Sequence, residues 1–586
     1  MFKIKLFNYL NIIFSIAASI IFCLQFDLSY KWFVINIIFA FYYLSIANFI
    51  VLFLSKFSSK VVLLITPIIL IIYQFHFFII HLSYYFGMIE FGTPFNLKII
   101  YPYIKNYRTL VEADYMSIQM TYGIIIIILV ILFFQLRFFW GINKSYSLIF
   151  NNFFVKKKGL KIFSSILLLL TPFVLINFVS TSNRVVAYKM NQPFLTFYYG
   201  SILGVEKNSD VEILLDKNHY PSNLNINKKN IIFIMCDALR SDYFGIVDKN
   251  ISSSPFVDSL LNTKKYFKHN NFYSHTSSSY TGILNSFSSR TSVYKDNFFL
   301  YDVLKKYGYN VKFVLSGDFT NYWDLKKLIK NLNVDFYSDG YIQNSKDSKI
   351  HINSDKDNVI NVLKSIKKFD GTPTFFYLHL MSTHQGSYVN KKTEEQEIEF
   401  NKKNIDAVKE NYKNRVVQLD DFLKKTFKIL KEKQFLDNSI VVITADHGQS
   451  LGDNDLLYHS KSTYISETQI PLIISVKEKS MRKIASQIDI APTLINILKL
   501  PQPKTWEGTS IFNDSINKSI YQRQRNIYSI IWSEKKEIYQ YVYYKKKSLF
   551  SLYNITKNNQ NEILKKKFSL SKLDSLNKVL KEYFKL

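Results

Sequence analysis

The chain has very few cysteine residues, and this scarcity excludes several classes of protein. Its 586 residues include only Cys23 and Cys236, so neither a disulfide framework nor a cysteine-rich zinc module can be built. Any bound metal ion must therefore be held mainly by oxygen and nitrogen ligands. Glycine (17) and proline (12) are scarce as well, while apolar types make up 48% of the chain. This balance excludes collagen-like and disordered compositions.

Acidic residues are also in the minority. Lysine and arginine number 74 and aspartate and glutamate 45, which gives a net charge of +29. Such an excess fits a nucleic-acid ligand, an anionic membrane surface or a lysine-rich proteome, and charge alone does not choose among them. No motif of interleaved basic and aromatic residues recurs along the chain, so we expect no nucleic acid among its partners.

Long uncharged apolar runs are almost absent after residue 185 but frequent before it. Five runs are long enough to span a bilayer, which takes about 20 helical residues. We expect the first run to be a retained anchor, because no A-x-A-like cleavage site follows it. The expected spans are residues 6–26, 32–55, 61–81, 119–136 and 162–180.

Basic residues in the loops predict the orientation of these spans, because lysine and arginine near span ends stay on the cytoplasmic side. With five spans, Lys3, Lys56 and the lysines at 156–158 fall on one side, and the nearly balanced loops at 27–31 and 90–114 fall on the other. We therefore expect an internal N-terminus and an external C-terminal part. The expected divisions are a transmembrane domain at 1–182, an interfacial linker at 183–220 and an extracytoplasmic domain at 221–586.

The external part has the pattern of an α/β domain. Short, continuously apolar runs at 230–236 and 439–444 are typical of strands buried on both faces of a parallel sheet. Strands alternating with helices predict a doubly wound, mostly parallel sheet whose ligands bind beyond the carboxyl ends of the strands. The other expected elements are strands at 311–315 and 374–380 and helices at 300–307 and 411–433.

The ends of the two apolar runs carry the first chemical signal. Asp237 follows the first run, and Asp446 and His447 follow the second. Two carboxylates and an imidazole at neighbouring strand ends can converge on one divalent cation. Each motif by itself also fits a helix cap or a turn residue.

A hydroxyl-rich loop at 271–284 adds a third segment. It carries Thr276, four serines and Thr281 ahead of an apolar stretch that can form a helix. A hydroxyl beside a cation and a helix N-terminus can act as a nucleophile, because the cation lowers its pKa and the helix end favours the phosphate it attacks. The alternative is a serine or threonine N-cap in a solvated loop.

Further motifs accompany these three segments. Arg240 follows Asp237, and His459 follows the segment A-D-H-G-Q-S-L-G. A segment H-L-M-S-T-H runs from His379 to His384, and Asp489 begins a late D-I-A-P-T-L.

In order, spacing and flanks, these segments resemble the membrane-bound phosphoethanolamine transferases of the sulfatase and alkaline phosphatase superfamily. The resemblance covers nearly the whole chain. It implies a multi-pass α-helical membrane domain of about five spans and an extracytoplasmic α/β domain with a central, mostly parallel sheet. It also implies a bacterial inner (cytoplasmic) membrane location, with the catalytic domain on the periplasmic or extracellular side.

The resemblance further implies a metal centre. Its ligands would be Asp237, Thr276, Asp446 and His447. The ion would be Zn²⁺, Mn²⁺ or another divalent cation.

Roles for the remaining polar residues follow from the same resemblance. Thr276 would be the nucleophile, with Thr281 as its rival in the same loop. His384 and His459 would bind the phosphoryl group or a second metal ion.

Three other polar residues near these motifs are not expected to take part in catalysis. We expect Arg240 to be structural and His275 to be an exposed loop residue. His379 lies on an expected strand, where we expect a core histidine with satisfied hydrogen bonds.

The implied reaction is transfer of phosphoethanolamine from phosphatidylethanolamine to a cell-envelope glycan or lipid, through a phospho-threonine intermediate. The implied partners are a phospholipid donor, that acceptor and the membrane. Two alternatives stay open: a phosphoglycerol transferase of the kind that builds lipoteichoic acid, and a non-catalytic lipid sensor on the same fold.

Two features of related enzymes are missing. Transferases acting on lipid A usually carry disulfides, one of them flanking the nucleophile loop, but Ser274 and Leu284 stand where that pair would be expected. Lipid A is therefore not implied as the acceptor. A sulfatase would need the segment C/S-x-P-S-R, which is absent, so sulfate-ester hydrolysis is not expected.

Overall fold

The computed structural model divides the chain into two compact units, Met1–Gly204 and Val205–Leu586. The structure describes residues 13–24, seven positions from 33 to 43, 60–90, and 211–584 with short gaps. Those gaps are residues 223, 227, 246–252, 292–296, 321–333, 385–403, 477–479, 514–517, 546–548, 557–560 and 563–569.

The first unit contains a long apolar helix, α3 (Lys60–Glu90), and a shorter one, Ile13–Leu24. Aromatic side chains pack between the two: Phe14 lies edge-on to Phe78 with ring centroids 4.6 Å apart. Within the described part of the chain, α3 is the one helix long and apolar enough to cross a membrane, over Ile68–Tyr85.

The five expected membrane spans are met only in part by these helices. The expected span at 61–81 lies within α3, and that at 6–26 overlaps the helix Ile13–Leu24. Residues 119–136 and 162–180 lie outside the described residues, as does most of 32–55. The multi-pass arrangement therefore stays a prediction.

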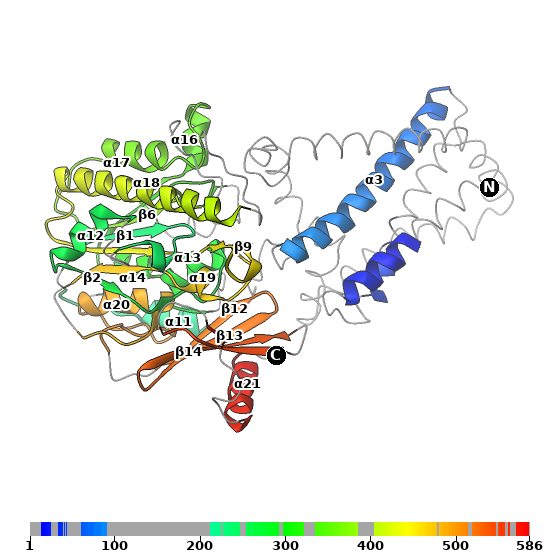
Figure 1. Ribbon diagram of the computed structural model, residues 1–586. Helices are drawn as coiled ribbons and strands as arrows, with labels where there is room; N and C mark the ends of the chain where they lie inside the picture. The colour runs from blue at the N-terminus through cyan, green and yellow to red at the C-terminus, as the bar shows by residue number, and fades with distance from the viewer. Residues whose placement is uncertain are drawn as a thin grey trace. The chain divides into compact units, whose positions relative to one another are not determined.

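The second unit is built on a seven-stranded sheet of order β2-β10-β7-β1-β6-β4-β5 (Figure 1). The strands from β7 to β5 run parallel, while β10 is antiparallel to both of its neighbours. This confirms the expected mostly parallel sheet, and the four expected strands coincide with β1, β7, β4 and β6. The strand bounds are β1 Asn230–Cys236, β2 Tyr266–His269, β4 Asn310–Leu315, β5 Phe336–Ser338, β6 Thr374–Leu380, β7 Ser439–Ala445 and β10 Leu472–Ser475.

The register of the central strands decides where the acidic residues emerge. All seven residues of β1 are buried, because β1 is covered on both faces and paired on both edges. Cys236, its last residue, is opposite Ala445 of β7 and Leu380 of β6. Parallel strands end at one edge of a sheet, so Asp237 and Asp446 leave the sheet side by side.

Helices cover both faces of the sheet. On one face, α12 packs against α18, whose buried residues recur with helical spacing, and α17 lies beside α18 (Figure 1). On the other face, α13 packs against α14 and α20. The expected helices at 300–307 and 411–433 correspond to α14 and α18. The bounds are α12 Pro255–Asn262, α13 Ser279–Ser288, α14 Leu300–Lys306, α17 Asn361–Ser365, α18 Ile405–Glu432 and α20 Ile490–Ile497.

The end of the expected interfacial linker belongs to the second unit. Helix α11 (Val211–His219) is joined to it by an ion pair of 2.9 Å between Lys217 and Asp302. Tyr220 Oη donates a hydrogen bond of 2.7 Å to the carbonyl oxygen of Pro501. Residues 211–220 of the expected linker therefore contact the second unit, while residues 183–210 lie outside the described residues, so the linker at 183–220 stays a prediction.

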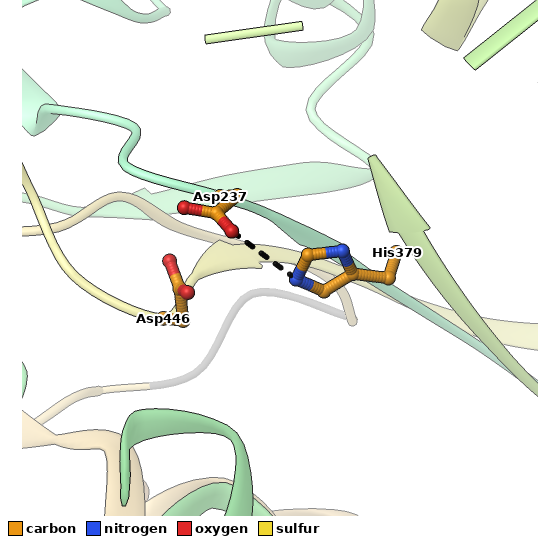
Figure 2. Close-up of side chains that lie close together, drawn as sticks. All are labelled: Asp237, His379 and Asp446. Atoms are coloured by element: carbon orange, nitrogen blue, oxygen red, sulfur yellow. Dashed lines mark ion pairs between the residues drawn. The ribbon is translucent and has the colours of Figure 1, made fainter. Parts of the chain in front are cut away.

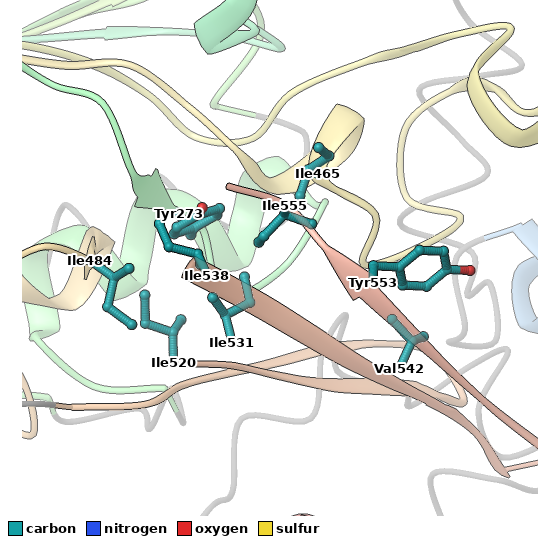
Figure 3. Packing of buried hydrophobic residues seen from close by; sticks show 9 residues of the cluster. All are labelled: Tyr273, Ile465, Ile484, Ile520, Ile531, Ile538, Val542, Tyr553 and Ile555. Carbon is teal, nitrogen blue, oxygen red and sulfur yellow. The ribbon is translucent and has the colours of Figure 1, made fainter. Parts of the chain in front are cut away.

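A second, antiparallel sheet was not anticipated from the sequence. It has the order β12-β13-β14-β15-β16 and carries helix α21 (Leu570–Phe584) on one face, where Leu573 and Leu580 are buried against it. The other face packs on Tyr273, Ile465 and Ile484 of the main body (Figure 3). The strand bounds are β12 Ile520–Gln524, β13 Ile527–Glu534, β14 Glu537–Tyr544, β15 Leu549–Asn554 and β16 Asn561–Glu562.

Tyr273 connects this second sheet with the hydroxyl-rich loop. It ends the short strand β3 (Phe272–Tyr273) and is fully buried in the cluster of Figure 3. Ser274, the next residue, donates its N–H to the carbonyl oxygen of Thr468 and begins the loop. The C-terminal sheet therefore holds one end of the loop in place.

Candidate active site

Asp237 and Asp446 form the buried acidic centre of the site. Asp237 is 4% and Asp446 0% exposed. Asp446 Oδ1 accepts backbone N–H groups from Ala238 and His447 at 3.0 and 2.8 Å. Asp237 Oδ1 and Asp446 Oδ2 are buried without a hydrogen-bond partner. Two such oxygens are costly to bury unless a cation or a proton offsets their charge.

The turn after Asp237 holds one residue in an unfavourable backbone conformation. Ala238 has a φ of 58°, in the left-handed region that costs a non-glycine residue about 1–2 kcal/mol. Its N–H is the donor to Asp446 Oδ1, and Tyr412 Oη donates to its carbonyl oxygen at 2.7 Å. Tertiary hydrogen bonds thus fix the turn that carries the first carboxylate.

His447 faces both carboxylates through one ring nitrogen. Its Nε2 lies 3.9 Å from Asp237 Oδ1 and 3.6 Å from Asp446 Oδ2. Nδ1 donates to the carbonyl oxygen of Gly448 at 2.7 Å, so Nε2 carries the lone pair. A histidine that binds a metal ion through one ring nitrogen typically donates its other ring N–H to a backbone carbonyl or a carboxylate.

His379 also lies in this cluster (Figure 2). It is the penultimate residue of β6, is fully buried, and its Nε2 is 4.0 Å from Asp237 Oδ2. Within the described part of the chain neither ring nitrogen has a partner at hydrogen-bond distance, although the backbone of Ser316 lies close enough to offset part of the fall in its pKa. The expectation of a satisfied core histidine is therefore wrong, because the ring lies at the carboxyl edge of the sheet and faces the two carboxylates. Asp237, His379 and Asp446 offer ligand atoms that lie within 4.8 Å of one another.

Ser279 brings a hydroxyl to the cluster. It is the first residue of α13, and its Oγ lies 2.9 Å from His447 Nε2. Because that nitrogen carries the lone pair, the serine donates the hydrogen bond. Gly282 allows this approach: a Cβ there would lie 2.4 Å from the carbonyl oxygen of Asp446. The first turn of α13 therefore lies directly against the end of β7.

Thr276 has a hydrogen-bond partner in the C-terminal sheet. Its Oγ1 donates to Gln524 Oε1 at 2.9 Å, and the same oxygen accepts the N–H of Ser277 at 3.3 Å. Gln524 Nε2 in turn donates to the carbonyl oxygen of Ser460 at 3.1 Å. Thr276 thus anchors the loop to β12, and among the described hydrogen bonds Ser279 is the loop hydroxyl that reaches His447. Thr281, the alternative nucleophile, follows Tyr280 in α13. Among the described residues, no hydrogen bond joins its side chain to Asp237, Asp446 or His447.

His459 lies beside His447, and His384 lies beside His459. The ring centroid of His459 is 4.3 Å from that of His447 and 5.3 Å from that of His384. His459 Nδ1 donates to Gln449 Oε1 at 2.8 Å, which leaves the lone pair on Nε2. The turn that carries His384 is held by Asp355, whose carboxylate accepts two backbone N–H groups at 2.8 and 2.9 Å. Nothing in the sequence indicated that role.

Burial controls the charge of these groups. Burial, followed by the charges of Asp446 and Asp355, raises the pKa of Asp237 well above its usual range. Burial lowers the pKa of His379 to about 4. Burial, and then the neighbouring imidazoles of His447 and His384, lower the pKa of His459 well below its usual range. These two imidazoles are therefore neutral near pH 7, with lone pairs available.

A divalent cation fits this set of donors. The two carboxylates and the imidazole of His447 are ligands that Zn²⁺ and Mn²⁺ accept. The unpartnered oxygens Asp237 Oδ1 and Asp446 Oδ2 both lie within 4 Å of His447 Nε2. Asp237, Asp446, His447 and the hydroxyl of Ser279 are the residues that would hold the ion.

Two further expectations are settled by hydrogen bonds. Arg240 is structural, as expected, because its guanidinium pairs with Asp242 and Asp453 at 2.7 and 2.6 Å. His275 is not exposed, and that expectation is wrong. It is 6% exposed, with Nδ1 2.5 Å from the carbonyl oxygen of Tyr521 and Nε2 3.0 Å from Ser486 Oγ. The C-terminal sheet, absent from the sequence prediction, covers it.

Substitution of Gly282 by alanine tests the close approach of α13. The added methyl would overlap the carbonyl oxygen of Asp446, and displacement of the helix by about 1 Å would lower turnover about a hundredfold. Steady-state turnover and thermal unfolding of the purified protein measure this. The matched control is Gly371→Ala, where a Cβ meets nothing within 4 Å and only the positive φ is strained. Full turnover in Gly282→Ala would contradict the proposed fit.

Part of the chain matches a known protein family. The family model described as Sulfatase matches residues 229–500. Lipoteichoic acid synthase 1 of Bacillus subtilis is 27% identical over 212 residues, 34% of this chain and 33% of that protein. The alkaline phosphatase superfamily protein PehA of Trinickia caryophylli is 31% identical over 116 residues, 18% of this chain and 22% of that protein. The chain thus spans a third or less of the length of these two curated relatives.

Two solved structures are also similar to part of this chain. The periplasmic domain of phosphoethanolamine transferase EptC from Campylobacter jejuni matches with a TM-score of 0.37 and 19% identity, over 49% of this chain and 92% of that one. Lipoteichoic acid synthase LtaP from Listeria monocytogenes matches with a TM-score of 0.42 and 17% identity, over 65% and 95%. The site residues from Asp237 to His459 all fall within residues 229–500, the range that the family model matches. The chain therefore contains a sulfatase-family domain at residues 229–500.

Proposed function

We propose that the second unit transfers the phosphoryl headgroup of a phospholipid to a hydroxyl group of a cell-envelope glycan or lipid. The donor proposed first is phosphatidylethanolamine, and the group transferred is phosphoethanolamine. The observation that carries the proposal is the contact of Ser279 Oγ with His447 Nε2 at 2.9 Å, beside two buried carboxylates and at a helix N-terminus. This arrangement supports attack of a hydroxyl on a phosphate.

The proposed nucleophile differs from the one that the resemblance implied. Thr276 donates to Gln524, whereas Ser279 donates to His447. We therefore place the covalent intermediate on Ser279, as a phospho-serine. Thr276 takes the part of a loop anchor.

A bound Zn²⁺, Mn²⁺ or similar ion would lower the pKa of the attacking hydroxyl and offset the charge of the phosphoryl group. Asp237, Asp446 and His447 are proposed to hold it. The N–H groups of the first turn of α13 would face the phosphoryl oxygens and bind them, since they have no partner within the helix.

The first half of the reaction releases diacylglycerol. Ser279 Oγ gives up its proton and attacks phosphorus, and the bond between phosphorus and the diacylglycerol oxygen breaks. Diacylglycerol leaves as an alcohol after taking up a proton. The headgroup stays on Ser279 as a phosphodiester.

The second half transfers the headgroup to the acceptor. An acceptor hydroxyl loses its proton and attacks phosphorus, the bond from phosphorus to Ser279 Oγ breaks, and Ser279 Oγ takes up a proton to become a hydroxyl again. His459 is suited to take the acceptor's proton, because its Nδ1 donates to Gln449 and its Nε2 carries the lone pair. His384, beside it, would contact the phosphoryl group. Two separate half-reactions predict ping-pong kinetics.

A second donor is favoured by one comparison. The curated relatives that align over the longest stretches include lipoteichoic acid synthases, so phosphoglycerol from phosphatidylglycerol is the second candidate. The non-catalytic lipid sensor ranks lower, because such a protein has no need of the buried carboxylates, the oriented His447 and the contacting hydroxyl together.

The proposed location follows from the donor. A lipid in the outer leaflet of a bacterial cytoplasmic membrane is reached most directly by a catalytic unit anchored to that membrane. Helix α3 supports such an anchor by its length and apolar character. The net charge of +29 would also favour anionic headgroups.

Intact mass spectrometry of the full-length protein tests this proposal. The protein is loaded with Zn²⁺ or Mn²⁺ and incubated with phosphatidylethanolamine or phosphatidylglycerol, and released diacylglycerol is measured in parallel. A mass increase of about 123 Da is expected for phosphoethanolamine, and about 154 Da would identify phosphoglycerol as the group transferred. If the ion binds but neither lipid gives an adduct or diacylglycerol, the transferase proposal fails.

A further inference from the structure

We infer that His379 is a further ligand of the divalent cation, through Nε2. The inference rests on the cation site of the proposed function, but it is independent of the headgroup transferred. It adds a residue to the ligand set that the resemblance implied, in which His379 was a core histidine.

The position of the ring supports direct ligation. Nε2 is 4.0 Å from Asp237 Oδ2, and the ligand atoms of Asp237, His379 and Asp446 lie within 4.8 Å of one another. Two ligands bound to one zinc ion at about 2.0–2.2 Å are separated by about 3–4 Å. Figure 2 shows Nε2 directed toward the two carboxylates, so small side-chain shifts suffice to complete a shared site.

His379 differs from two other buried histidines in the hydrogen bonds of its ring nitrogens. His269 is 5% exposed; its Nε2 lies 2.8 Å from the carbonyl oxygen of Arg482, and its Nδ1 accepts the N–H of Asn271 at 3.2 Å. His275 likewise has a partner on each nitrogen. His379 is 0% exposed and, among the described residues, has no partner at hydrogen-bond distance on either nitrogen. Since buried polar groups are otherwise paired, an ion is the partner that the acidic surroundings favour.

The ring is also held in place before any ion arrives. His379 is flanked within the sheet by Met235 of β1 on one side and Leu315 of β4 on the other. Phe319 packs edge-on against it with ring centroids 4.9 Å apart. A ligand fixed by packing loses little conformational entropy when it binds a metal ion.

The competing interpretation is a hydrogen bond to substrate or to a protonated Asp237. The separation of 4.0 Å from Asp237 is too long for a hydrogen bond. An imidazole that contacts only the phosphoryl group would change turnover and leave the affinity for the ion unchanged.

Metal binding by the full-length protein in detergent distinguishes these interpretations. The protein is stripped with chelator and titrated with Zn²⁺ by calorimetry, and Co²⁺ is bound separately for its visible absorption spectrum. We expect His379→Ala to weaken Zn²⁺ binding at least about tenfold and to change the Co²⁺ spectrum. His379→Gln keeps much of the side-chain volume and is expected to weaken binding similarly. Thermal unfolding in chelator reports whether each variant is folded.

The matched control is His269→Gln, a buried histidine outside the site. It is expected to unfold at a lower temperature, because two hydrogen bonds are lost, and to bind Zn²⁺ as the wild type does. Wild-type affinity together with an unchanged Co²⁺ spectrum in His379→Ala would overturn the inference, even if turnover fell. Equal weakening in His269→Gln would also overturn it, since the effect would then lie in the fold. If the wild type binds neither ion, the cation site of the proposed function fails as well.

Discussion

Ser279→Ala is expected to lower turnover by about three orders of magnitude or more and to remove the covalent adduct. The variant lacks the oxygen that we propose attacks phosphorus, and removal of a nucleophile has effects of this size or larger. Thr276→Ala is expected to keep the adduct, because it removes a hydrogen bond to Gln524. Its cost should be about 1 kcal/mol of stability and less than about a tenfold change in turnover. Diacylglycerol release and intact mass measure both variants.

Two further variants sharpen this contrast. Ser279→Thr retains a hydroxyl and should keep part of the activity, whereas Ser278→Ala, at the N-cap of α13, should keep most of it. If Ser279→Ala still forms the adduct while Thr276→Ala does not, the nucleophile is Thr276, as the resemblance implied. The loop would then have to rearrange when the ion and the lipid bind.

Asp446→Asn is expected to remove the response of the protein to divalent cations. Oδ1 accepts two backbone N–H groups, while Oδ2 has no partner. An asparagine can keep those two hydrogen bonds through its oxygen, but it presents an amide N–H₂ group in place of the second oxygen. Affinity for Zn²⁺ should fall at least about a hundredfold, and turnover about a thousandfold.

Thermal unfolding with and without Zn²⁺ checks this expectation. An ion present at about a hundred times its dissociation constant stabilises the wild type by about 2.7 kcal/mol, and Asp446→Asn should lose that increment. Without the ion the variant should be at least as stable as the wild type, since burial and Asp446 together raise the pKa of Asp237 and the substitution removes the second charge.

Asp453→Asn is the matched control for that substitution. Asp453 pairs with Arg240 at 2.6 Å, outside the proposed ligand set. The variant should be less stable both with and without Zn²⁺ and should keep the stabilisation that the ion provides. An Asp446→Asn protein that is stabilised by Zn²⁺ as much as the wild type would contradict the proposed site.

The central sheet was predictable because its signals are local. Six consecutive apolar residues in β1 are buried, and so is every residue of β7 after Ser439. Strands of this kind are typical of a parallel sheet that is covered on both faces. That alone places Asp237 beside Asp446, because the two strands end at one edge. The motif that carries His447 comes immediately after β7, so its position followed too.

The choice of hydroxyl was not predictable in the same way. Thr276 and Ser279 lie three residues apart in one polar run, and no local rule states which of them reaches the acidic centre. Gln524 decides this by binding Thr276 from β12, almost 250 residues further along the chain. The sheet that contains β12 gave no recognised signal in the sequence, so its effects on Thr276 and His275 were missed.

By itself, then, the sequence determined the strands, the two acidic strand ends, the histidines that follow them and the apolar character of the N-terminal part. Each of these depends on residues close together in the chain. The tertiary structure decided that Ser279 contacts His447, that Thr276 and His275 are tied to the C-terminal sheet, and that His379 lies among carboxylates without a hydrogen-bond partner. These outcomes depend on strand register, on the close approach of α13 at Gly282 and on contacts between distant segments, which no local pattern encodes.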